Sequence, residues 1–177
     1  MYKRIIIAVF LLLPFATVQA ESGKGQKKIQ WLTFEQAMEK MKKEPRKIIV
    51  DVYTDWCGYC KKMDRETFSN PKVVEYVNKH YYAVKFNSEK TFHPITYKGI
   101  EFKYVKEGRK GVHELATALL NNRLSYPTMV YINEKNEIIS PVPGYMPADD
   151  FYALLHFIKD DHFKTGNFQD FLKTFPQ

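Results

Sequence analysis

Apolar residues gather in short runs along the chain, and four of these runs predict strands. Lys47 to Tyr53 is nearly all apolar and rich in β-branched residues, a pattern typical of a strand buried on both faces of a sheet. A proline stands at the entrance of the third run, and a turn over 133–136 leads into the fourth. The predicted strands cover 47–53, 81–87, 126–133 and 137–142.

Apolar residues at helical spacing fill the segments between these strands. Thr33 with Gln36 forms a capping-box pattern ahead of the first helix. Asn70-Pro71 places a cap residue and a first-turn proline at the start of another. Further helices are predicted at 57–68, 112–122, 147–158 and 168–175. Strands that alternate with helices and then close in a hairpin predict an α/β fold, a mixed sheet with helices on both faces.

The N-terminus has the pattern of a secretory signal peptide. A short basic start precedes the apolar run from Ile5 to Val18, and small residues lead up to Ala20. The run is shorter than the ~20 residues of a spanning helix, which favours cleavage near Ala20 over a retained anchor. We expect a periplasmic or otherwise exported protein with a signal peptide at 1–20, a flexible segment at 21–30 and one folded domain at 31–177.

Composition supports a folded domain and argues against a nucleic-acid partner. Hydrophobic residues make up 45% of the 177 residues, enough for a core. The formal net charge of +7 falls to +5 without residues 1–20, because two bases and no acids are lost. The remaining bases are interleaved with acids, whereas a nucleic-acid surface needs a focused basic patch or a known motif.

The chain has two cysteines, Cys57 and Cys60, and their spacing points to reactivity. A disulfide that closes so short a loop removes little chain entropy, so it would stabilise the fold only slightly. Cys57 is expected between a strand end and a helix start, where the helix N-terminus favours a thiolate. Cys60, one turn later, is placed to resolve a mixed disulfide. A zinc site would need two further ligands. Of the five histidines only His156 and His162 approach the usual spacing, so we expect no metal and no cofactor beyond the Cys57–Cys60 disulfide.

The segment Val50 to Lys61 resembles the active-site stretch of thioredoxins. It is more similar still to the C-terminal periplasmic domain of the transmembrane thiol:disulfide interchange proteins, a family that also continues as this chain does at 67–71. The resemblance covers about 47–88 and 112–158 and implies a thioredoxin fold. Residues 89–111 form an insertion that the resemblance does not explain, either a hairpin or an irregular excursion around Lys98-Gly99.

The resemblance also implies roles for individual residues. Asp51 matches a buried acid that exchanges a proton with the resolving thiol, and Lys85 matches the partner of that acid. Pro127 matches a cis-proline that packs beside the cysteines. The catalytic residues would be Cys57, Cys60, Asp51 and Lys85, and the substrate-binding residues would be Trp56, Gly58, Tyr59, Tyr126, Pro127 and Gly144. From the residues alone, Trp56 could equally belong to the core, Lys85 could be an exposed lysine, and Pro127 an ordinary trans proline.

Two features leave the function open in part. Tyr59 stands where thioredoxins have proline. The dipeptide Gly58-Tyr59 instead resembles that of periplasmic disulfide isomerases, so it does not decide between reduction and isomerisation. The aromatic residues of the insertion would form a partner surface or cover a neighbouring core edge; they are Phe92, Tyr97, Phe102 and Tyr104.

The leading hypothesis is an exported, monomeric enzyme that exchanges thiols and disulfides with protein substrates and takes electrons from a membrane donor. The alternatives are a non-enzymatic binding module, a copper-delivery protein that uses the same cysteines, and a thiol sensor. A sensor would need a single dominant cysteine, and no methionine- or histidine-rich copper motif lies near Cys57.

Overall fold

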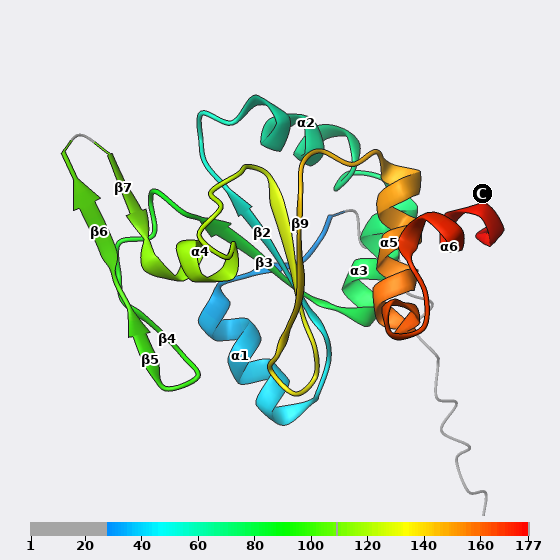
Figure 1. Ribbon diagram of the computed structural model, residues 1–177, viewed down its shortest axis with the longest axis horizontal. Coiled ribbons are helices and arrows are strands. Elements are labelled where there is room, and N and C mark those ends of the chain that lie inside the picture. The colour runs from blue at the N-terminus through cyan, green and yellow to red at the C-terminus, as the bar shows by residue number, and fades with distance from the viewer. Residues whose placement is uncertain (1–27, 109, 177) are drawn as a thin grey trace, which may run out of the picture.

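A five-stranded mixed sheet forms the centre of the molecule (Figure 1). The computed structural model describes residues 28–108 and 110–176, so the expected signal peptide and most of the segment at 21–30 lie outside the described residues. The strand order is β1-β3-β2-β8-β9, in which β1, β3 and β2 are parallel and β8 and β9 antiparallel. The strands are β1 (Trp31–Leu32), β2 (Ile48–Tyr53), β3 (Tyr82–Asn87), β8 (Thr128–Ile132) and β9 (Ile138–Pro143).

Six helices accompany the sheet in the described part of the chain. Thr33 caps the first with both hydrogen bonds of the predicted capping box, and Asn70 with Pro71 begins the third as predicted. The helices are α1 (Phe34–Lys43), α2 (Gly58–Glu66), α3 (Pro71–His80), α4 (Glu114–Leu119), α5 (Ala148–Lys159) and α6 (Phe168–Thr174), with a short 3₁₀ turn at His162–Lys164.

Alternation along β2 and β3 gives the sheet two buried faces, each with its own core. Val50 and Val52 point to the face that α1 and α4 cover. Ile49 points to the opposite face, where α2, α3 and α5 pack and α6 adds its aromatic residues. Because side chains alternate along a strand, Asp51 shares the face of Ile49 and lies on the side of α2.

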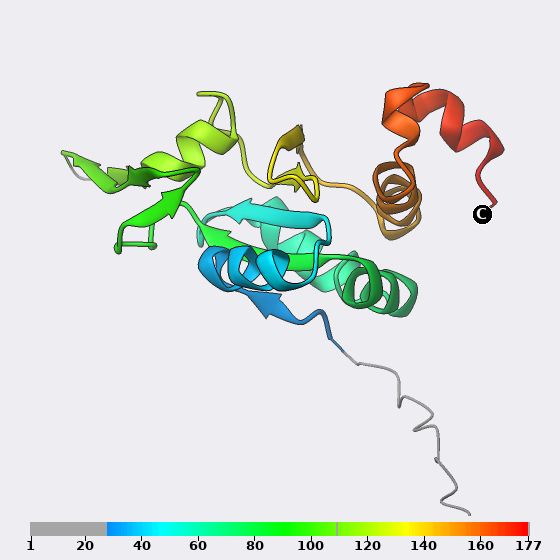
Figure 2. The same cartoon turned by 90° about the horizontal axis from the view of Figure 1, so that it is seen from below.

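The insertion folds as two β-hairpins between β3 and α4. The first pairs β4 (Ile95–Tyr97) with β5 (Ile100–Phe102), and the second pairs β6 (Tyr104–Glu107) with β7 (Lys110–His113). Both project from one end of the sheet, and α5 and α6 lie at the other end (Figures 1 and 2). The predicted excursion is therefore ordered as hairpins, and the expected turn at Lys98-Gly99 links β4 to β5 with positive φ at both residues.

Three boundaries differ from the sequence-based expectation. Ile29 is buried and the Gln30 amide donates to Asn78, so the packed chain begins before residue 31 and the expected flexible segment is held down at its end. The short strand β1 was not predicted. The helix expected at 112–122 starts only at Glu114, because Val112 pairs with Val105 in the second hairpin.

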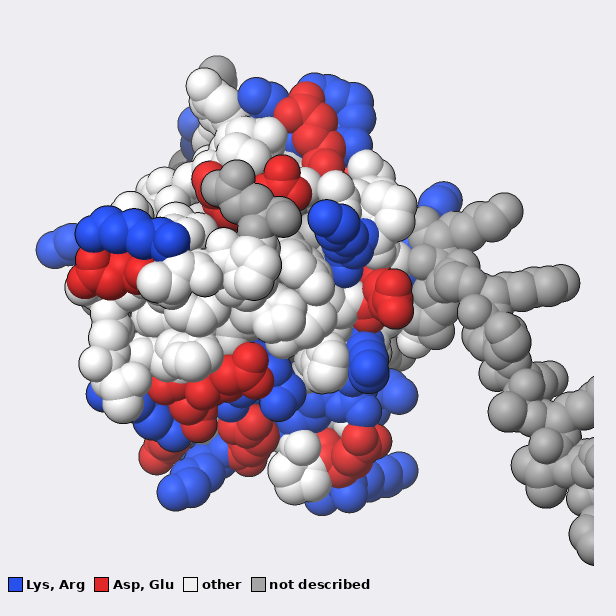
Figure 3. Space-filling model, turned by 90° about the vertical axis from the view of Figure 1, so that its right-hand side faces the viewer, with Lys and Arg blue, Asp and Glu red and all other residues white. Residues whose placement is uncertain are grey.

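Charged residues of both signs are mixed over the face that carries α5 and α6 (Figure 3). Lysines and arginines lie beside aspartates and glutamates there, and they form no single basic patch on this face. Across residues 28–108 and 110–176, no helix is both long and apolar enough to cross a membrane.

Candidate active site

Cys57 lies directly before α2 and is its N-cap residue. Its Sγ accepts a hydrogen bond from the Cys60 backbone N–H at 3.0 Å, and the two sulfurs form a disulfide of 2.07 Å. Both cysteines are buried. In the reduced protein, this N–H group and the positive end of the α2 dipole would stabilise a Cys57 thiolate. The structure therefore places the pair where the sequence predicted, at the junction of β2 and α2.

Asp51 lies on the sheet on the side of α2 and is almost completely buried. It is the register partner of Lys85 in the parallel β2–β3 pair, and Lys85 Nζ lies 2.5 Å from Asp51 Oδ2. The second oxygen, Oδ1, has no hydrogen-bond partner among the described residues. Burial raises the pKa of Asp51 to about 6, against the opposing attraction of Lys85.

Lys85 also pairs with Asp64 of α2, a residue that the sequence analysis did not single out. Its ammonium group lies 4.9 to 5.0 Å from the centres of three aromatic rings, those of Trp31, Tyr53 and Phe68. Burial alone would lower the pKa of Lys85, but attraction and hydrogen bonds from the two carboxylates raise it overall. Lys85 is therefore a charged bridge between the sheet and the helix that carries the cysteines.

Trp56 is exposed over 64% of its surface and is not a core residue. Its indole Nε1–H donates to Glu89 Oε2 at 2.8 Å. Its ring also meets the ring of Tyr126 edge to face, with centroids 6.0 Å apart. Glu89 is a second residue that the sequence did not indicate; it belongs to the insertion and fixes the side chain beside Cys57.

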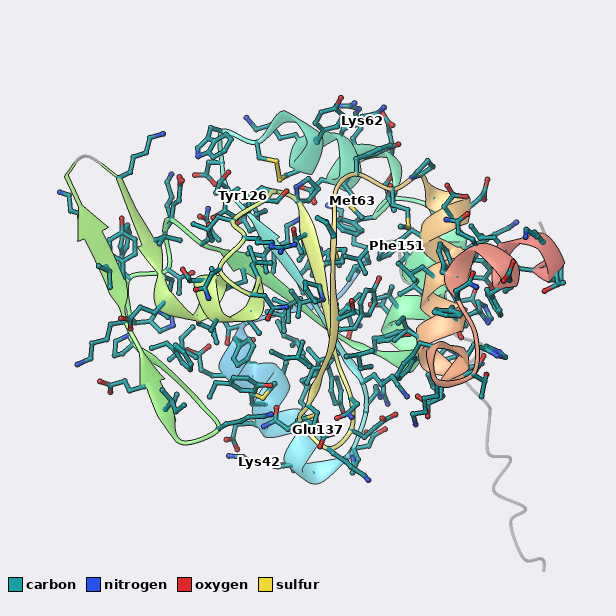
Figure 4. All side chains as sticks on the ribbon, in the orientation of Figure 1. Lys42, Lys62, Met63, Tyr126, Glu137 and Phe151 are labelled. Atoms are coloured by element: carbon teal, nitrogen blue, oxygen red, sulfur yellow. A yellow bond between two sulfur atoms is a disulfide. The ribbon has the colours of Figure 1, made fainter. Side chains whose placement is uncertain are left out.

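The Tyr126–Pro127 peptide bond is cis, as the resemblance implied. The Pro127 carbonyl accepts a hydrogen bond from the Gly144 N–H at 2.8 Å, which joins two of the predicted substrate-binding residues directly. Gly144 has a φ of +100°, a conformation that other residues rarely adopt. The Tyr126 hydroxyl accepts from Ser88 Oγ at 2.8 Å. Tyr126 lies two residues before β8 (Figure 4). The first residue of β8, Thr128, pairs with Val52 near the end of β2.

Gly58 and Tyr59 form the outer turn of the motif. Tyr59 is exposed over 64% of its surface, and its ring centroid lies 6.2 Å from that of Tyr145. A Cβ added at Gly58 would meet no side chain and no other segment within 4 Å, so a larger residue has space there. Trp56 contacts Tyr126, Pro127 bonds to Gly144, and Tyr59 contacts Tyr145, which lies 86 positions further along the sequence.

The strand order of the sheet and the disulfide at the start of α2 are those of a thioredoxin fold. The chain belongs to the thioredoxin-like domain family, which matches residues 34–159. The family that the sequence indicated is thereby confirmed.

One relative is the thiol:disulfide interchange protein DsbD of Pectobacterium atrosepticum, 29% identical over 115 residues. The match covers 64% of this chain and 16% of DsbD, so the chain spans only a small part of that protein. Among solved structures, DsbH oxidoreductase is similar with a TM-score of 0.57 and 14% identity, over 81% of this chain and 92% of that one. A disulphide-isomerase, so named provisionally, from Bacteroides thetaiotaomicron has a TM-score of 0.53 and 25% identity, over 80% and 99% of the two chains.

Proposed function

We propose that this protein is an exported thiol–disulfide oxidoreductase that reduces or isomerises disulfides of exported proteins. The observation that carries the proposal is the position of Cys57, whose sulfur accepts the Cys60 N–H at the N-terminus of α2. The ion pair of the buried Asp51 with the partly exposed Lys85, on the side of the sheet that α2 covers, supports it. The protein acts as a monomer without a bound cofactor, after removal of residues 1–20.

Reduction proceeds in two exchanges. The Cys57 thiolate attacks one sulfur of a substrate disulfide, which forms a mixed disulfide and releases the first substrate thiol. The Cys60 thiol then loses its proton and attacks Cys57 Sγ. This step releases the second substrate thiol and closes the Cys57–Cys60 disulfide, so two electrons pass from the protein to the substrate.

Asp51 is the proposed proton acceptor for Cys60. Its raised pKa lets the carboxylate take up a proton near neutral pH, and its unpartnered Oδ1 leaves an acceptor free. Lys85 orients the carboxylate through Oδ2. The residues proposed to hold the substrate chain are Trp56, Gly58, Tyr59, Tyr126, Pro127 and Gly144; Trp56, Gly58, Tyr59 and Gly144 are exposed, Tyr126 is half-buried and Pro127 is buried.

Continued reduction needs a donor of two electrons for the Cys57–Cys60 disulfide, and we propose a membrane thiol-redox protein. The direction of exchange depends on the reduction potential of the pair, which equilibration with glutathione buffers measures. Thioredoxin has a reduction potential of about −270 mV, and a value near it would favour reduction. A value closer to that of a strong oxidant, about −120 mV, would favour oxidation or isomerisation.

Reduction of insulin by the purified protein with dithiothreitol tests the activity. We expect Cys57→Ala to abolish the catalysed rate and Cys60→Ala to accumulate mixed disulfides through Cys57. A circular dichroism spectrum of each variant controls for folding. A folded Cys57→Ala variant that keeps the wild-type rate would exclude the proposal.

A further inference from the structure

An open groove lies between the two hairpins, α4 and the segment before β8. Its volume is about 970 Å³, near the upper end of the range of small-molecule sites. Three of its apolar residues are well exposed: Ile100 at 59%, Leu124 at 47% and Val105 at 38%. The remaining apolar lining comes from Phe102, Val112 and Ala118. Large apolar side chains gathered on one surface are typical of a binding site.

The groove is continuous with the redox site. Two of its lining residues, Glu89 and Tyr126, contact Trp56 beside Cys57, one by a hydrogen bond and one through its ring. Tyr126 is also the residue before the cis-proline. A substrate chain whose cysteine lies at Cys57 would therefore reach the groove without a break in the surface.

The charges in the groove favour a basic occupant. Three carboxylates line it, on Glu89, Glu101 and Glu114, against the single ammonium of Lys110. Lys103 lies close by and pairs with Glu101, and both side chains are more than half exposed. With Lys103 included, three carboxylates face two ammonium groups, an excess of one acid in a chain whose net charge is +7.

We infer that the groove binds the segment of a substrate protein next to its reacting cysteine, and that it selects segments with apolar residues and an arginine or lysine. The inference rests on the proposed function and names the class of substrate for the same site. It gives the insertion a role, because β5, β6 and β7 supply one wall of the groove.

Single-turnover reduction of disulfide peptides by the pre-reduced protein tests this. The peptides share one intramolecular disulfide and differ in a flanking arm: leucines with arginine, leucines with glutamate, or serine and glycine only. Each turnover oxidises the Cys57–Cys60 dithiol and reduces one peptide disulfide, so no further reagent is needed. Oxidised glutathione, which carries no flanking arm, reports on the redox centre alone.

The double substitution of Ile100 and Leu124 by serine removes exposed apolar surface without opening the core. We expect the wild type to react about tenfold faster with the leucine–arginine peptide than with the serine–glycine peptide, and this preference to vanish in the double variant. Phe92→Ser is the matched control, because Phe92 is 65% exposed in the same insertion but does not line the groove. It should keep the preference.

A charge exchange tests the electrostatic part. Glu101→Lys should lower the rate constant for the arginine peptide and raise that for the glutamate peptide, each about threefold and less at high salt. Equal rate constants for all three peptides in the wild type would overturn the inference, as would a preference that survives the double substitution. Failure to reduce any peptide or glutathione would instead overturn the proposed function.

Discussion

Lys85 Nζ lies 2.5 Å from Asp51 Oδ2 across the β2–β3 pair, and the same ammonium group also contacts Asp64 on α2. The carboxylate on the sheet and the helix that carries the cysteines are thus joined through one cation. A change at Asp64 or Lys85 should therefore alter the pKa of Asp51, since both charges act on that buried carboxyl.

Asp51→Asn should stabilise the oxidised protein at neutral pH and not at low pH. A raised carboxyl pKa means that the folded protein binds the proton more tightly than the unfolded chain, so the wild type loses stability as pH rises from about 4 to above 6. A shift from 3.8 to about 6 corresponds to about 3 kcal/mol. Urea unfolding at pH 4 and pH 8 should show the difference between variant and wild type grow by about this amount.

Glu75→Gln provides the matched control for that experiment. Glu75 is exposed on α3, so its amide variant should follow the wild type at both pH values. An Asp51→Asn variant whose stability difference from the wild type is the same at pH 4 and pH 8 would contradict a raised pKa at this carboxyl.

Asp64→Asn should lower the pKa of Asp51. The negative charge of Asp64 raises that pKa, and without Asp64 the Lys85 ammonium is left to interact with Asp51 alone. The Asp51 carboxyl carbon shift, followed by NMR over pH, should titrate at lower pH in the variant. Asp55→Asn should leave the midpoint in place, because Asp55 is exposed and pairs with Lys90.

Glu89→Ala should release the Trp56 side chain. The indole N–H would lose its carboxylate acceptor, so its proton resonance should move upfield. The indole of Trp31, which packs against Phe68 in the core under α2 and α3, is an internal control in the same spectrum. An unchanged Trp56 resonance would mean that this hydrogen bond does not form in solution.

Gly111→Ala should loosen the second hairpin. An added Cβ would lie 2.3 Å from Tyr104 Oη and 2.8 Å from the Val105 carbonyl oxygen, so the Tyr104 ring must leave its place beside Phe92. Overpacking of this kind typically costs about 1–3 kcal/mol. Hydrogen exchange of the amides in β6 and β7 should become faster.

Gly166→Ala is the control for this substitution, because a Cβ there would meet no atom within 4 Å. Hairpin amides in the Gly111→Ala variant that exchange at the wild-type rate would show that Tyr104 moves aside without cost.

Local signals in the sequence predicted most of the fold. The caps at Thr33 and Asn70 and the apolar strand before Cys57 depend on neighbouring residues, and the structure has each of them in place. The positions of Asp51 and Pro127 followed from the resemblance of their motifs. The pairing of Lys85 with Asp51 then follows from register, since the two residues are directly opposite in the β2–β3 pair.

The features that escaped prediction depend on contacts between distant segments. Strand β1 has two residues and exists through its pairing with β3. No local pattern marks Glu89 or Asp64 in the sequence. Glu89 contacts Trp56, 33 positions away, and Asp64 contacts Lys85, 21 positions away. Val112 lies in a helical pattern, but pairing with Val105 holds it in a strand.

The two faces of the sheet divide the molecule in a way that bears on how such proteins diversify. The Asp51–Lys85 pair lies with the core under α2 and α3, whereas the hairpins and α4 pack on the opposite core. Mutation of one face can therefore proceed while the other is preserved. Partner choice and electron-transfer chemistry would then be separately heritable traits, and the hairpins could be exchanged between relatives as a unit while the redox centre stays intact.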